Sequence, residues 1–101
     1  MWILVMFDLP VKKKIQRKRA TEFRKKLLKD GFTMIQLSVY LRPAPSEENA
    51  AVHLNRVRNF LPPEGQVHIM KITDKQFGRM ICFQGETAHA PEKMPRQLEL
   101  F

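Results

Sequence analysis

The chain has 101 residues, 44% of them hydrophobic, which is enough for one domain with a small core. Its 18 Lys and Arg outnumber 10 Asp and Glu, and a net charge of +8 favours a polyanionic partner such as nucleic acid. No apolar run approaches the roughly 20 residues that span a bilayer, and the apolar start lacks the basic leader and cleavage site of a signal peptide. The single cysteine, Cys82, excludes an internal disulfide, so we expect a cytoplasmic protein without membrane contact.

The N-terminal stretch is a run of six apolar residues, 2–7, that ends in the carboxylate of Asp8. A short apolar run of this kind favours a central strand buried on both faces, and Pro10 prevents its continuation because proline has no N–H to donate. Asp8 is the only carboxylate among the first 21 residues. We expect it at the carboxyl end of the strand, where side chains emerge from a packed scaffold.

Residues 12–29 predict a basic amphipathic helix. Ala20, Phe23 and Leu27 form its apolar stripe, and Asp30-Gly31 ends it. Glu22 is the only acid, against ten basic residues: Lys12, Lys13, Lys14, Arg17, Lys18, Arg19, Arg24, Lys25, Lys26 and Lys29. The simple interpretation is a solvated face. Because unpaired like charges destabilise a helix, we prefer a phosphate backbone lying along it.

The middle of the chain combines strand and helix signals. Residues 32–42 alternate as a strand does, and they form either one long strand or two joined by a bend near Leu37-Ser38. Ser46 is a suitable N-cap for a second amphipathic helix, which Pro62-Pro63 ends.

The last third predicts two strands, 66–72 and 77–83, joined by a turn at 73–76 in an antiparallel hairpin. Residues 85–96 indicate an extended tail, and Leu98, Leu100 and Phe101 indicate an edge strand on this subunit or a partner. The fold class is therefore α+β, a sheet covered on one face by two helices. If residues 32–42 form two strands, the fold is a ferredoxin-like βαββαβ sandwich over residues 1–84, and residues 85–101 form a C-terminal tail and edge strand.

Asp8 is the main candidate for chemistry, and two interpretations are open. It could cap the first helix, or it could be a hard-metal ligand. One carboxylate binds Mg²⁺ poorly, but a twofold axis would pair Asp8 from two subunits, and a divalent cation would relieve their repulsion. Such a metal could activate water or stabilise charge on a phosphodiester. The other candidates are not assigned to chemistry: His53, His68 and His89 are interpreted as surface or structural residues, and Cys82, Trp2 and Phe7 as core residues.

The strand that ends Phe7-Asp8-Leu9-Pro10, the basic helix, Gly31-Phe32 and the segment 36–40 together resemble a known family. It is the family of small CRISPR-associated proteins of spacer acquisition whose name carries the number two. Within that family the chain looks most similar to the type II members. The resemblance continues through 73–77 to Gly85-Glu86, so it covers most of the chain.

The resemblance implies a ferredoxin-like homodimer whose C-terminal strands pack on the neighbouring subunit. It implies a metal-dependent endonuclease for single-stranded RNA, or in some members duplex DNA, with Asp8 binding Mg²⁺, or Mn²⁺, at the dimer interface. Arg17 and Arg19 match the family's helix arginines associated with activity or nucleic-acid contact. It also implies a partnership with the CRISPR integrase, in which the basic surface holds the spacer-precursor duplex. Phe7 is a departure, since many members have Tyr there, and it puts activity in question if that hydroxyl assists catalysis.

Three functions compete at this point. The first is a Mg²⁺-dependent phosphodiesterase with catalytic Asp8 and nucleic-acid-binding Lys12, Lys13, Lys14, Arg17 and Arg19. The second is a non-catalytic basic scaffold that only holds the duplex for an integrase. The third is an RRM-type RNA-binding module, which requires exposed aromatics on the sheet.

Overall fold

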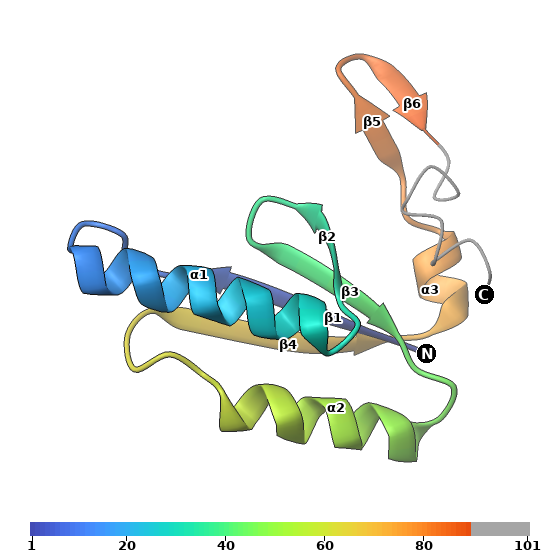
Figure 1. Ribbon diagram of the computed structural model, residues 1–101. Coiled ribbons are helices and arrows are strands. Elements are labelled where there is room, and N and C mark those ends of the chain that lie inside the picture. Colours follow the sequence, from blue (N-terminus) through green and yellow to red (C-terminus); the bar gives the residue numbers. More distant parts are fainter. Residues whose placement is uncertain (90–101) are drawn as a thin grey trace.

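The structure, a computed structural model, describes residues 1–89, with side chains described to residue 86. Strands β1 (Trp2–Asp8), β2 (Thr33–Gln36), β3 (Val39–Pro43) and β4 (Gln66–Ile72) form an antiparallel sheet in the order β2-β3-β1-β4. Helices α1 (Lys14–Lys29) and α2 (Glu47–Asn59) cover one face of this sheet (Figure 1). This order of elements and strands confirms the ferredoxin-like α+β prediction.

Strand β1 is central, and its alternate side chains have different environments. Ile3, Val5 and Phe7 lie in the core between sheet and helices, together with Phe23 of α1 and Val57 of α2. The opposite face is less covered than the sequence predicted. Its side chains are buried at Trp2, half-buried further along β1 and exposed at the end of the strand.

Helix α1 begins and ends through local contacts. The Gln16 side chain accepts a hydrogen bond from the Lys13 backbone N–H at 2.9 Å, which satisfies one donor at the N-terminus. The predicted stripe, Ala20, Phe23 and Leu27, is buried. Gly31 follows the helix with φ of +93°, the left-handed conformation in which glycine has no steric penalty. The predicted helix and its termination are both confirmed.

The middle segment is two strands, with the turn at Leu37-Ser38. Ser38 adopts a φ of 62°, and its carbonyl accepts a hydrogen bond from the Phe7 N–H at 3.0 Å, so the turn contacts β1. Helix α2 begins as predicted, because the Ser46 hydroxyl accepts from the Asn49 N–H at 3.1 Å.

A polar cluster joins α1, β3 and α2. The Asp30 carboxylate, 9% exposed, lies 2.8 Å from His53 Nδ1 and 2.9 Å from the Arg56 guanidinium. The guanidinium of Arg42 donates to the Asp30 carbonyl. Burial lowers the pKa of Arg42 below its ordinary value, and although Asp30 opposes this, the positive charge of Arg56 adds to it. His53, taken from the sequence as surface or structural, is a buried structural residue.

The predicted hairpin of 66–72 with 77–83 is wrong. Residues 74–78 form a short helix, α3 (Asp74–Gly78), because the Thr73 hydroxyl accepts from the Gln76 N–H at 3.1 Å and the Gln76 side chain accepts from the Thr73 N–H at 2.8 Å. Phe77 stacks on Trp2 with ring centroids 4.2 Å apart, so α3 covers the beginning of β1.

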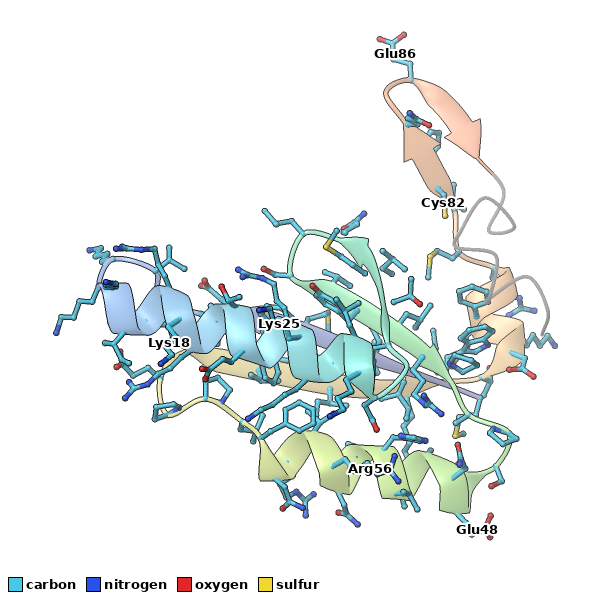
Figure 2. The ribbon with its side chains drawn as sticks, in the orientation of Figure 1. Lys18, Lys25, Glu48, Arg56, Cys82 and Glu86 are labelled. Carbon is cyan, nitrogen blue, oxygen red and sulfur yellow. The ribbon has the colours of Figure 1, made fainter. Side chains whose placement is uncertain are left out.

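After α3, β5 (Cys82–Gln84) pairs with β6 (Thr87–His89) in a separate two-stranded sheet that projects from the domain (Figure 1). Glu86 marks its tip in Figure 2. The remaining tail and the edge strand predicted at Leu98, Leu100 and Phe101 lie outside the described residues. Among residues 1–89, no helix is both long and apolar enough to cross a bilayer.

Candidate metal centre and nucleic-acid interface

Asp8 is the last residue of β1, and its side chain is exposed. Helix α1 has no acidic residue in its first turn, and its N-cap is Lys13, so Asp8 does not cap it. Within the described part of the chain, the Asp8 carboxylate has neither a hydrogen bond nor an ion pair. The capping interpretation is therefore wrong, and the carboxylate is available to a ligand.

Strand register places Asp8 on the sheet face that α1 and α2 leave open. Successive side chains of a strand point to opposite faces, so Asp8 shares a face with Met6, not with Phe7. Gln66 lies directly opposite Asp8 on β4, and His68 lies opposite Met6, diagonal to Asp8. On β4, the neighbours of Asp8 on this face are thus an amide and an imidazole.

A single copy of this site does not provide a complete metal shell. No group of three or more His, Cys, Asp or Glu side chains that could hold a metal occurs among the residues whose positions are described. The carboxylate of Asp8 is a hard oxygen donor that suits Mg²⁺ or Mn²⁺, but these ions favour more than one protein ligand. The donor type therefore fits the expected metal, and one copy supplies fewer than three such donors within the described residues.

Phe7 occupies the position at which many members of the resembled family have tyrosine, so its surroundings show where that hydroxyl would lie. The Phe7 ring is buried on the helix side, stacked on Tyr40 with centroids 5.6 Å apart and edge-on to Phe23 at 5.0 Å. A hydroxyl added to this ring would enter the helix-side core, on the opposite face of the sheet from the Asp8 carboxylate. The absence of that hydroxyl therefore does not change the immediate surroundings of Asp8.

The predicted nucleic-acid-binding lysines are exposed. Lys12, Lys13 and Lys14 occupy the loop after β1 and the first residue of α1, close in sequence to Asp8. A shallow groove continues along α1, lined by Lys14, Ile15, Arg17, Lys18, Thr21, Glu22 and Lys25. Figure 2 shows Lys18 and Lys25 on α1, and both are exposed. One side of α1 thus presents a nearly continuous positive surface.

The two predicted arginines have structural contacts as well. Arg17 donates from one guanidinium nitrogen to the carbonyls of Val11 and Lys12, at 3.1 and 2.7 Å, and so holds the loop after β1. Arg19 forms an ion pair with Glu64 at 3.4 Å. Substitutions of either arginine would therefore change local structure together with charge.

Similarity to known proteins shows the family to which this chain belongs. The family model described as CRISPR associated protein Cas2 matches residues 1–80. This chain is a member of the Cas2 family. It is 54% identical over its whole length to the CRISPR-associated endoribonuclease Cas2 of Flavobacterium psychrophilum, covering 88% of that protein. It is 46% identical to the protein of the same name from Parvibaculum lavamentivorans, with both chains fully covered.

The fold also matches a solved Cas2 structure. The crystal structure of Streptococcus pyogenes Cas2 at pH 6.5 aligns with a TM-score of 0.63 over 83% of this chain and all of that one, at 18% identity. This match confirms the expected fold, and the family model and the two relatives confirm the expected family.

The sequence did not predict a place in the candidate site for three residues, Gly65, Glu64 and His68. Gly65 has a φ of +88° and lies against the Asp8 backbone, and Glu64 binds both Arg19 and Gln16. His68 was judged surface or structural, although the alternation of β4 would have placed it on the open face once the pairing with β1 was known. The Pro62-Pro63-Glu64-Gly65 turn was a usable signal for Gly65, because glycine often supplies positive φ in turns.

Proposed function

We propose that this Cas2-family chain is a metal-dependent endoribonuclease of spacer acquisition. In this proposal the chain works as a homodimer, in which Asp8 of each subunit binds one shared Mg²⁺ or Mn²⁺. The printed names of its relatives, CRISPR-associated endoribonuclease, support the reaction class. The observation that carries the site is the exposed Asp8 carboxylate, free of protein partners among residues 1–89, at the end of a central strand.

The open sheet face supports the proposed dimer. Trp2 and Leu41 form its small buried cluster, with Leu4, Ile35, Ile72 and Phe77 partly buried around them. Met70, on the same face, is 49% exposed. A second copy packed on this face would cover apolar surface, and a twofold axis near the end of β1 would bring two carboxylates together.

The chain's own groups have separate tasks in this mechanism. When bound, the metal supplies Lewis acidity toward the phosphodiester and a more acidic water. The two Asp8 carboxylates hold it and offset its charge. Lys12, Lys13 and Lys14, with Arg17 and Arg19, bind the phosphate backbone and orient the strand over the site.

The same basic surface supports wider partnerships in the proposal. It would hold the spacer-precursor duplex while the chain associates with the CRISPR integrase, and both would place the protein in the cytoplasm. Single-stranded RNA and duplex DNA share the phosphate chemistry that lysines and arginines recognise, so the surface suits either.

Removal of the metal, or of its ligand, tests the enzyme. Cleavage of single-stranded RNA should stop in excess EDTA and return when Mg²⁺ or Mn²⁺ is added. The full chain with Asp8→Asn should lose at least about 10³-fold in cleavage rate, since the metal supplies several kcal/mol of transition-state stabilisation. Binding of the same RNA, measured without metal, should remain within about threefold of wild type. Cleavage by Asp8→Asn at the wild-type rate would remove the proposed mechanism.

Glu64 reduces the charge available on α1, and its substitution tests the basic surface. Glu64→Gln should strengthen duplex DNA binding about threefold and steepen the dependence of log K on log salt by up to about 0.9, the value of one added phosphate contact. The amide retains an acceptor for Gln16 but releases Arg19. Glu47→Gln, which removes an equal charge from the ion pair with Lys71, is the control. Equal effects of the two substitutions would show that only net charge matters.

A second candidate is the scaffold that binds the duplex without cleavage. It is favoured by the fact that the basic surface is complete in one chain, whereas the metal site requires two. Under this function Asp8→Asn leaves spacer acquisition unchanged, and under the first it removes nuclease activity. The RRM-type module lacks its main feature, since the described aromatics of the four-stranded sheet, Trp2, Phe7 and Tyr40, are buried.

A further inference from the structure

Gly65 makes an unusually close approach to the candidate ligand residue. A Cβ built on Gly65 would lie 2.6 Å from the Asp8 carbonyl oxygen and 3.0 Å from Leu9 Cα, and both contacts are with backbone. Real Cβ atoms essentially never approach to 2.6 Å, so any side chain here must move one of the two backbones. We propose that Gly65 is a positioning residue for Asp8, a role that rests on the proposed function.

The backbone around Gly65 is held on both sides. Gln66, the next residue, pairs with Asp8 at the end of a seven-pair ladder that joins β1 and β4. Glu64, the preceding residue, accepts from Gln16 at 2.9 Å and from Arg19 at 3.4 Å, which ties the turn to α1. Because the turn is tied on both sides, a Cβ on Gly65 pushes against Asp8 more readily than the turn moves away.

A displaced Asp8 carbonyl also displaces its carboxylate. Both groups are attached to the same Cα, so a tilt of the peptide plane rotates the bond from Cα to Cβ. In a twofold-symmetric site each subunit moves by the same amount, which doubles the change in separation of the two carboxylates. Mg²⁺ and Mn²⁺ sites depend on ligand geometry, and loss of a residue that orients a ligand typically weakens metal binding 10- to 100-fold.

Direct metal binding tests the role without relying on cleavage. Free Mn²⁺ measured by electron paramagnetic resonance on the full-length protein should show about tenfold weaker binding by Gly65→Ala. Gly65→Asn is the second variant, because asparagine tolerates positive φ but keeps the Cβ. It should fold well and weaken Mn²⁺ binding to the same degree.

Gly31→Ala is the matched control. Gly31 also has positive φ, +93°, and its added Cβ would strike the Arg42 guanidinium. Arg42 pairs with Ile3, at the opposite end of β1 from Asp8. Gly31→Ala should therefore lose stability without losing Mn²⁺ affinity. Wild-type affinity in both Gly65 variants, or an equal loss in Gly31→Ala, would overturn the positioning role.

The Asp8→Asn variant distinguishes a failure of the positioning role of Gly65 from a failure of the proposed metal site. If Asp8→Asn binds Mn²⁺ as wild type does, the metal site itself is wrong and the role of Gly65 falls with it. If Asp8→Asn loses binding while Gly65→Ala and Gly65→Asn retain it, only the role of Gly65 is overturned.

Discussion

If the proposed homodimer shares one metal, a dimer in which only one subunit carries Asp8→Asn should bind Mn²⁺ about 100-fold more weakly than the wild-type dimer, and should cleave RNA at a correspondingly low rate. A shared site loses half of its carboxylates in such a dimer, and one remaining carboxylate holds these ions poorly. The wild-type dimer should bind one ion. The two subunits can be coexpressed with different affinity tags, and the mixed dimer isolated by purification on both.

The alternative is one independent metal site in each subunit, and it predicts a different number of ions bound per dimer. Independent sites predict two ions in the wild-type dimer, and one ion of unchanged affinity in the mixed dimer. A mixed dimer with one Glu48→Gln subunit is the control, because Glu48 is an exposed carboxylate on α2 (Figure 2). If the Asp8 mixed dimer still binds one ion with the wild-type affinity and the wild-type dimer binds two, the shared site is contradicted.

The features that the sequence predicted correctly have local causes. Ser46 caps α2, Gly31 follows α1, and Pro10 comes after the end of β1, and each effect acts within a few residues. The bend at Leu37-Ser38 was one of two alternatives, and pairing of β2 with β3 decides it. Helix α3 was missed although its signal was local, because Thr73-Asp74-Lys75-Gln76 was interpreted as a turn and not as a capping box.

The candidate site depended on contacts that no local pattern contains. Alternation separates Asp8 from Phe7, but only the packing of α1 and α2 shows which face stays open. Glu64 lies 48 positions from Gln16 and 45 from Arg19, so neither contact can be read from spacing. The apolar run that ends in a carboxylate supplied Asp8 as a candidate, the resemblance supplied Arg17 and Arg19, and the structure added Gly65, which has no chemistry of its own.

Asp30→Ala should lower the free energy of unfolding by about 3 kcal/mol, the largest loss of stability that we expect from one polar substitution in this chain. The reason lies in the unequal exposure of the two partners of Asp30. Arg56 is 58% exposed and can turn to water, whereas His53 is 6% exposed and cannot. Removal of the carboxylate thus leaves the His53 ring nitrogen buried without its partner.

Urea unfolding at fixed protein concentration measures this loss of stability. Two further substitutions, Asp30→Asn and Asp74→Ala, serve as comparisons. Asp30→Asn keeps an acceptor for His53 but removes the charge that faces Arg56, so it should cost about half as much. Asp74→Ala removes an ion pair with the N-terminal ammonium, but Asp74 is 78% exposed, so its cost should stay below about 1 kcal/mol. If Asp30→Ala costs no more than Asp74→Ala, burial of His53 does not govern the cluster. The junction of α1, β3 and α2 would then depend on its apolar contacts alone.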